Sequence, residues 1–197
     1  MSLTARLAEA VAEANQLNDR LVAEQAEQVA AAARLLADTL KGGGKILLFG
    51  NGGSAADAQH LAAEFVNRFR IERPPLAALA LTTDTSILTS IANDYDFLEV
   101  FAKQVRALGR PGDAALGLST SGNSTNVVKA LEVARQMGLK TLALSGGEGG
   151  PVARAAELAI VIPSRSTPRI QEVHITIGHV LCDLVDFLLF PDKFPKD

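Results

Sequence analysis

The chain has 197 residues, of which 48% are hydrophobic and 21% charged, so it can bury a full core, and disorder as its main state is excluded. A formal net charge of −3 gives no basic surface for nucleic acid or for an anionic membrane. At this length one domain is expected over residues 1–197, with residues 1–40 as a helical extension.

Cysteine content and the N-terminal segment indicate the compartment. The single cysteine, Cys182, excludes an intrachain disulfide, a zinc ribbon and a redox Cys-x-x-Cys pair. The N-terminal sequence MSLTARLAEAVAEANQL lacks the uninterrupted apolar core of a secretion signal. No apolar run approaches the roughly 18 residues that span a bilayer. These features predict a protein of the cytoplasm.

Residues 2–40 contain no glycine or proline, and their apolar side chains recur at helical spacing. The pattern predicts an amphipathic helix that breaks once near residues 15–19. Such a helix cannot bury its apolar stripe alone, so it must pack on the rest of the chain or on a second copy. The stripe consists of Leu3, Leu7, Ala10, Ala14, Leu17 and Leu21.

Beyond residue 44, short continuous apolar runs alternate with helical segments, which is typical of parallel strands covered by helices on both faces. We therefore expect an α/β fold, a three-layer sandwich with a five-stranded parallel sheet and ligands at the carboxyl ends of its strands. The predicted strands are 46–49, 76–81, 114–118, 141–144 and 158–162. The predicted helices are 54–69, 85–92, 98–108, 124–137, 150–156 and a final helix from Pro168, whose apolar face carries Ile170, Val173, Ile177, Val180, Leu184 and Leu188.

The first strand is followed by the glycine-rich loop GNGGSA at residues 50–55. Glycines allow close backbone approach to a ligand, and the helix that follows offers free N–H groups to an anion. The loop also matches the Gly-x-Gly-x-x-Ala dinucleotide pattern, but Asp84 lies too far along the chain for the acidic partner of that motif. A tight turn capped by Ser54 is the plain alternative.

The third strand is followed by the loop STSGNST at residues 119–125, which holds five hydroxyls and a glycine before a helix. This composition predicts a phosphate cradle that uses no Lys or Arg and suits a monophosphate ester. The Gly-Lys-Ser/Thr ending of an ATP- or GTP-binding loop is missing. A serine-rich turn that only caps its helix is the alternative.

Two of the three histidines fall on predicted helices in polar surroundings. His60 and Glu64 lie one turn apart on one face, a spacing that can chelate a divalent ion or form a surface ion pair. His179 lies on the polar side of the final helix. His174 lies on a different face of that helix, and we interpret it as a structural histidine.

Four segments, GNGGSAADAQHLAAEF, ALTTDTSILTSIANDYDF, LSTSGNSTNVVKA and RIQEVHITIGHVLCDLVD, follow one another along the chain. In these segments the chain resembles the sugar isomerase (SIS) domain family, and within it the branch that isomerises heptose phosphates. The resemblance covers nearly the whole chain. It implies the SIS fold and the conversion of sedoheptulose 7-phosphate to D-glycero-D-manno-heptose 7-phosphate, which supplies heptose to bacterial surface glycans such as lipopolysaccharide.

The resemblance also implies a homotetramer with active sites at subunit interfaces and one zinc ion per subunit. The implied zinc ligands are His60, Glu64, Gln171 and His179. The implied contacts to the sugar phosphate are Asn51, Gly52, Gly53, Ser54, Glu64, Asn93, Asp94, Ser119, Thr120, Ser121, Ser124 and Gln171, of which the serines and threonine at 119–124 hold the phosphate.

Aldose–ketose isomerisation moves a proton between C1 and C2 and needs a base, an acid and a group that polarises the carbonyl. Glu64 can serve as the base and His179 as the acid. Gln171 and His179 are eight residues apart, about 12 Å along a helix, so one ion can hardly take both from one regular helix. Gln171 therefore either stretches from a frayed helix start or comes from another subunit, and we favour the second arrangement.

The SIS fold also serves as a non-catalytic binding module. A relative of the heptose phosphate isomerases acts in this way by binding the replication initiator DnaA. The acid–base pair distinguishes the two functions, and because the chain has both Glu64 and His179, the sequence favours the isomerase.

Overall fold

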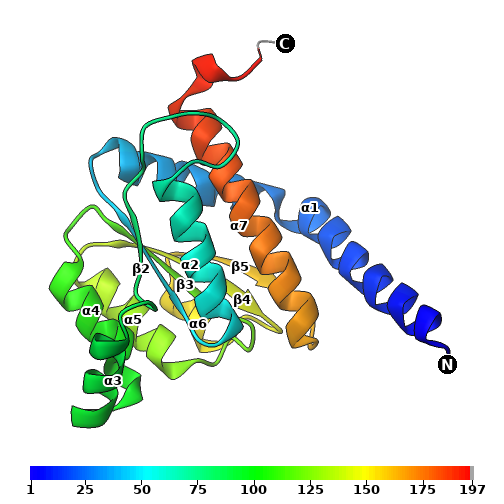
Figure 1. The fold of residues 1–197 in the computed structure, drawn as a ribbon, viewed down its shortest axis with the longest axis horizontal. Helices are drawn as coiled ribbons and strands as arrows, with labels where there is room; N and C mark the ends of the chain where they lie inside the picture. The colour runs from blue at the N-terminus through cyan, green and yellow to red at the C-terminus, as the bar shows by residue number, and fades with distance from the viewer. Residues whose placement is uncertain (196–197) are drawn as a thin grey trace.

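The computed structural model describes residues 1–195 and has the predicted three-layer α/β architecture (Figure 1). Five parallel strands form one sheet in the order β2-β1-β3-β4-β5. The strands are β1 (Ile46–Gly50), β2 (Ala78–Ala80), β3 (Ala114–Ser119), β4 (Lys140–Gly146) and β5 (Leu158–Ile162). The predicted fold class and all five strands are confirmed, although the edge strand β2 is shorter than the apolar run that predicted it.

Helices cover both faces of the sheet. The α-helices are α1 (Leu3–Lys41), α2 (Gly53–Val66), α3 (Thr85–Asp94), α4 (Val100–Leu108), α5 (Thr125–Gln136), α6 (Gly150–Ala155) and α7 (Thr167–Leu189), and two 3-10 helices span Phe97–Glu99 and Pro191–Lys193. In residues 1–195 no helix is both long enough and apolar enough to cross a membrane.

Two apolar cores explain why the strands are continuous apolar runs. Ile46 and Leu48 of β1 pack on α1, α2 and α7, whereas Leu47 and Phe49 pack on α4, α5 and α6. All four side chains are fully buried, because alternate residues of a strand point to opposite faces of the sheet. A strand covered on both faces therefore has no position for an exposed polar residue.

The predicted break in the N-terminal helix near residues 15–19 is wrong, because α1 is one uninterrupted helix of 39 residues. Asn18 fits the helix by donating its side-chain amide to the Ala14 carbonyl at 3.0 Å. Leu17 and Leu21 are buried in the core, so packing outweighs the weak helix propensity of asparagine and aspartate.

Helix α1 also closes one edge of the sheet. The Gln25 amide donates to the Val161 carbonyl at 2.6 Å and accepts from the Val161 N–H at 3.0 Å. Val161 lies in the edge strand β5, so the side chain of Gln25 occupies the place of a neighbouring strand.

The predicted apolar face of α7 is wrong in its second half. Val180 is 40% exposed and Leu188 is 43% exposed, whereas Leu181 and Val185 are buried. In the second half of α7 the buried residues are Ile177, Leu181 and Val185. The sequence pattern instead predicted that Val180, Leu184 and Leu188 would be buried. Val180 lines an apolar groove of about 230 Å³, together with Leu21, Val22, Ala26, Val29, Ile177 and Leu184.

Strand order fixes where a ligand can bind. The order reverses between β1 and β3, and at such a switch point the loops that leave the two strands diverge to opposite faces and open a crevice at the carboxyl edge. The loops concerned, residues 50–53 and 119–125, are the two that the sequence marks as ligand-binding.

At the amino ends of the strands, Asp113 links the starts of β1 and β3 by hydrogen bonds. Its carboxylate accepts from the backbone N–H groups of Lys45 and Arg110, each at 2.9 Å, and from the Lys45 ammonium at 2.5 Å. Burial works to raise the pKa of Asp113, but these bonds hold it below its ordinary value.

Replacing Asp113 by alanine should lower the free energy of unfolding by about 2–3 kcal/mol, because it leaves two backbone donors unpaired. Urea unfolding measures the loss. The stabilisation by Asp113 is complete above the pKa of about 3.9 that its carboxyl has in the unfolded chain. It is lost as the pH falls through the lower pKa that this carboxyl has in the folded protein.

Glu157→Ala, which removes an exposed ion pair with Lys140 at the same end of the strands, is the control and should cost less than about 1 kcal/mol. Equal losses in the two variants would contradict the role of Asp113.

Candidate active site

Three side chains of types that can bind a metal ion meet between α2 and α7. His60 and Glu64 lie one turn apart on α2, with the imidazole Nε2 3.1 Å from the Glu64 carboxylate. His179 on α7 brings its own Nε2 to 3.1 Å from that of His60. One ligand atom from each residue lies within 4.8 Å of the other two. The structure thus brings together three of the four predicted zinc ligands from one chain.

The helices approach closely because α7 carries a glycine at their contact. A methyl group at Gly178 would overlap the side chain of Leu61 on α2. Leu61 and Gly178 are the chain neighbours of His60 and His179, so the close approach of the two backbones also brings the two imidazoles into contact.

The donor set fits a zinc ion. Ligand atoms about 2.0–2.1 Å from a tetrahedral zinc lie about 3.3 Å from one another, close to the two separations of 3.1 Å. Two imidazole nitrogens and a carboxylate oxygen are among the ligands that zinc takes in catalytic sites.

Aromatic contact orients the His179 ring. Phe69, in the connection after α2, stacks on the imidazole with ring centroids 5.4 Å apart and an interplanar angle of 23°. The His60 ring lies 5.0 Å away at 57°. The His179 imidazole therefore stacks on Phe69 and has the tilted His60 ring as its second neighbour.

Gln171 lies on α7, eight residues before His179. Its amide packs on Gly53 at the start of α2, where any larger residue would displace it. It also lies beside Asp57, a buried carboxylate whose second oxygen has no hydrogen-bond partner within residues 1–195. Burial raises the pKa of Asp57, and the Gln171 amide, His60 and His179 act in the opposite direction.

Asp57 is a site residue that the sequence analysis missed. Its spacing of three residues before His60 places both on one face of α2, and this spacing could have identified it. Gln171 is not at a frayed end, because α7 begins at Thr167. The hypothesis that Gln171 and His179 reach one ion from different subunits stays a prediction.

The glycine loop is held by a pair of amides. Asn51 and Asn126 exchange two hydrogen bonds of 2.9 Å between their side chains, which ties the β1–α2 loop to the start of α5. Asn126 is buried and was also missed. Helix α2 begins at Gly53 with Gly52 at its N-cap, and no side chain caps it, so the alternative of a Ser54 cap is wrong. The N–H groups of Ser54 and Ala55 instead donate to the Asn51 and Gly52 carbonyls, each at 3.0 Å.

The hydroxyl loop forms a compact cradle at the N-terminus of α5. Ser119 lies 2.9 Å from Ser124 and 3.4 Å from Ser121, oxygen to oxygen. Ser124 takes the N-cap position without making a capping bond. The alternative of a loop that only caps its helix is therefore not supported, and with Thr120 the hydroxyls surround a helix end that attracts anions.

The loop between β4 and α6 forms one wall of this cradle. Gly122 has φ +69°, and a Cβ there would lie 2.6 Å from the Gly149 carbonyl. The N–H of Val152 donates to the Gly122 carbonyl at 3.0 Å. The β4–α6 loop thus fixes the shape of the cradle.

His174 has a structural place behind this wall. It is completely buried, and its Nε2 lies 3.1 Å from the Ser145 carbonyl. Burial lowers the pKa of His174 to about 4, while the Ser145 contact works against the shift. The imidazole is therefore neutral at pH 7 and donates to Ser145, as a structural histidine would.

Asn93 and Asp94 lie apart from the other predicted residues. They form the exposed last turn of α3, where the Asn93 amide donates to Asp94 at 2.8 Å. Helix α3 packs on α4 and on the 3-10 helix before it. Within one chain the structure does not bring these two residues to His60 or His179.

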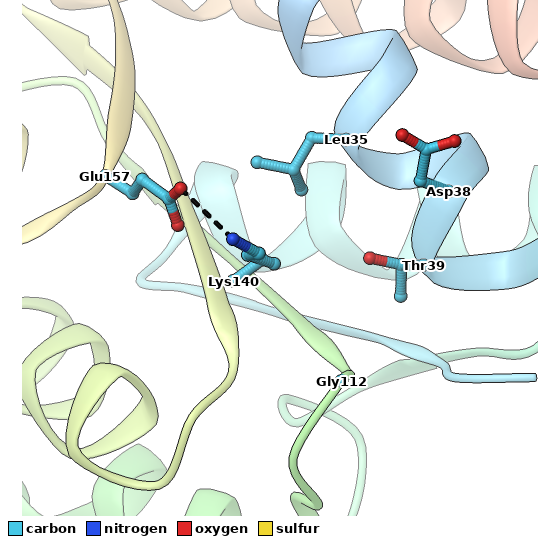
Figure 2. A pocket seen from close by; sticks show the side chains of 6 residues that line it. All are labelled: Leu35, Asp38, Thr39, Gly112, Lys140 and Glu157. Atoms are coloured by element: carbon cyan, nitrogen blue, oxygen red, sulfur yellow. Dashed lines mark hydrogen bonds and ion pairs between the residues drawn. The ribbon is translucent and has the colours of Figure 1, made fainter. Parts of the chain in front are cut away.

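Figure 2 shows a larger cavity, of about 390 Å³, at the amino ends of the strands. It is lined by Leu35, Asp38, Thr39, Gly112, Lys140 and Glu157. Lys140 and Glu157 pair with each other at 3.3 Å, and no predicted site residue lines the cavity. Size alone therefore does not identify the site, whereas strand topology does.

Replacing Gly122 by alanine should weaken binding of inorganic phosphate at least tenfold, or about 1.4 kcal/mol, because the new methyl group pushes the Gly149 wall out of place. Isothermal titration calorimetry measures the affinity. Gly147→Ala is the matched control, since Gly147 has φ +64° and open space around its Cβ position. It should cost about 1–2 kcal/mol of stability without changing the affinity. Equal affinities in both variants would contradict the cradle.

Comparison with known proteins agrees with this geometry. A family model described as SIS domain matches residues 11–146. The chain is 50% identical to the phosphoheptose isomerase of Thermodesulfovibrio yellowstonii over 96% of this chain and 94% of that protein. It is 58% identical to the phosphoheptose isomerase of Desulfovibrio desulfuricans over 89% of this chain and 83% of that protein.

Solved structures agree as well. The phosphoheptose isomerase GmhA from Neisseria gonorrhoeae superposes with a TM-score of 0.88 at 46% identity, covering 94% of this chain and 99% of that one. The sugar isomerase domain of an RpiR transcription factor from Sphaerobacter thermophilus shares the fold, with a TM-score of 0.66 at 20% identity, covering 98% of this chain and 94% of that one. The chain belongs to the SIS domain family and, within it, to the phosphoheptose isomerases, which makes it an isomerase rather than a non-catalytic binding module.

Proposed function

We propose that the chain converts sedoheptulose 7-phosphate to D-glycero-D-manno-heptose 7-phosphate through an enediol. The observation that carries this proposal is the meeting of His60, Glu64 and His179 within 4.8 Å, on helices that also border the hydroxyl cradle. His60 lies about 10 Å along α2 from Gly53. This span suits a substrate whose phosphate and reacting carbons are at opposite ends of a seven-carbon chain.

Glu64 is the base in this proposal. Its Oε1 contacts His60 at 3.1 Å, and Oε2, which takes no part in that contact, removes the proton from the carbon next to the carbonyl. His179 is the acid in this proposal and delivers a proton to the substrate oxygen. A base and an acid on two different helices can act on the two sides of one substrate.

The cradle supplies orientation without a basic side chain. Hydroxyls of Ser119, Thr120, Ser121 and Ser124, together with the amides at the start of α5, hold the phosphate. Binding energy from this remote group positions the reacting carbons. Asn51, Gly52, Gly53 and Ser54 contact the sugar at the start of α2, beside Gln171.

A zinc ion is proposed at His60, Glu64 and His179, with Gln171 as the fourth donor. When bound, zinc supplies a Lewis acid that polarises the substrate carbonyl. The Asp57 carboxylate beside Gln171 then serves to orient this amide, as groups behind metal ligands commonly do.

A homotetramer with sites at subunit interfaces is also proposed. Leu3, Leu7 and Val11 on α1 are 87%, 65% and 50% exposed and form a stripe along one face of the helix, which extends away from the sheet (Figure 1). An apolar stripe of this kind needs a partner helix. A second copy would also bring the exposed Asn93 and Asp94 to the site of its neighbour.

We place the reaction in the cytoplasm, in keeping with the single buried thiol. Its product would supply heptose for bacterial surface glycans such as lipopolysaccharide.

Incubating the purified protein with sedoheptulose 7-phosphate and zinc should produce the aldose, followed by NMR. Glu64→Gln keeps the shape of the side chain but cannot accept the proton, so the turnover number should fall about 10²–10⁴-fold. Inhibition by inorganic phosphate, which reports on the cradle, should stay unchanged in this variant. Absence of turnover in the unmodified protein, with and without zinc, would refute the proposed reaction, and unchanged turnover in Glu64→Gln would exclude Glu64 as the base.

Replacing Leu7 by lysine should dissociate the tetramer into smaller species in sedimentation velocity, because the charge cannot enter an apolar helix contact. Ala5→Lys adds the same charge to the opposite side of α1, where Ala5 is exposed, and should leave the assembly intact. A monomeric unmodified protein, or equal sizes for both variants, would contradict this interface.

A further inference from the structure

Arg73 is the most completely buried arginine side chain among the ion pairs of residues 1–195, with no exposed surface. It lies in the connection between α2 and β2 and was not marked by the sequence. Its guanidinium donates to the backbone carbonyls of Glu64 at 2.9 Å and Phe65 at 2.7 Å. It also donates to the Asn67 and Pro74 carbonyls at 3.2 and 3.3 Å.

The Glu64, Phe65 and Asn67 carbonyls lie at the C-terminal end of α2, whereas Pro74 belongs to the connection that follows. The last four carbonyls of a helix have no partner inside it, and α2 lacks a glycine cap there, since its C-cap is Asn67. Arg73 takes the place of such a cap, and its positive charge lies at the negative end of the helix dipole. One of the carbonyls it holds belongs to Glu64 itself.

The same guanidinium also binds α7. Its Nε donates to Asp186 at 2.8 Å, and the Asp186 side chain is 1% exposed. Asp186 lies seven residues after His179, which is two turns further on the same face of α7. Arg73 therefore joins the end of the helix that carries Glu64 to the helix that carries His179.

We infer that Arg73, through Asp186, is a positioning residue for the acid–base pair. The inference rests on the proposed roles of Glu64 and His179. Their contacts with His60 are both 3.1 Å, and shifts of about 1 Å at reacting groups cost about 10²-fold in rate. The Arg73–Asp186 pair sets the separation of α2 and α7 at one end of the site, as Gly178 does beside the histidines.

Stability alone does not account for such a pair. Buried ion pairs add little net stability, because removing two charges from water costs about as much as their attraction returns, and apolar replacements of both partners are often neutral. The connection that Arg73 anchors also carries Phe69, which stacks on the His179 ring. Both effects of Arg73 therefore converge on the geometry of His179.

The test compares Arg73→Lys and Asp186→Asn with Asp113→Asn. Asp113 is another buried, ion-paired carboxylate, but it lies at the amino edge of the sheet, away from α2 and α7. With sedoheptulose 7-phosphate, the first two variants should lose about 10²-fold in kcat with KM and phosphate inhibition unchanged. Asp113→Asn should lower the melting temperature and leave kcat unchanged.

The double variant Arg73→Met with Asp186→Leu guards against simple unfolding. It removes both charges at similar volume, so it avoids the buried, unpaired charge that either single change leaves, and it should still show the loss in kcat. A double variant that is stable and fully active would overturn the inference.

Histidine ring NMR gives a readout independent of turnover. The chain has only three histidines, so their ring nitrogen signals can be assigned by substitution. Asp186→Asn should shift the signals of His60 and His179 and leave that of His174 in place, whereas unchanged His60 and His179 signals would overturn the inference. If the unmodified protein does not turn over sedoheptulose 7-phosphate, the proposed function fails, and these signals still decide the role of Arg73.

Discussion

The contact between Leu61 of α2 and Gly178 of α7 is the constraint on which the site depends. A glycine inside a helix costs about 1 kcal/mol relative to alanine, and here it removes the Cβ that would keep α2 away. Helix α2 follows the first strand and α7 follows the last, and the missing side chain at Gly178 lets the two helices come close enough for His60 and His179 to touch. Gly178 thus makes α7 less stable as a helix, and it allows the imidazoles of His60 and His179 to lie in contact.

The site combines two kinds of polar environment. At the switch point of the sheet, helix N-termini and hydroxyls attract an anion without a fixed positive charge, while between α2 and α7 imidazoles and carboxylates are held by packing and by buried hydrogen bonds. The first environment suits the unreactive end of a sugar phosphate, and the second suits its reacting end. A small net charge of the whole chain is compatible with both.

Much of this arrangement was predictable from the sequence. Continuous apolar runs predicted the parallel strands. The four-residue spacing of His60 and Glu64 predicted that both lie on one face of a helix, as they do in the cluster with His179. The surroundings of that cluster were not predictable, because Asp57, Asn126 and Arg73 act through contacts between segments that are distant in the chain. The apolar face of α7 was misread for a related reason: the helix packs on α1, α2 and the sheet at once, so no single apolar stripe describes it.

The hydrogen bonds between the Gln25 side chain of α1 and Val161 of the edge strand β5 bear on the role of the N-terminal helix. The edge of a parallel sheet exposes unpaired N–H and C=O groups, which invite pairing with the strands of other molecules. Because α1 occupies that edge at Val161, a chain shortened by its first 40 residues would lose a guard against aggregation. The N-terminal helix is therefore an integral part of the domain.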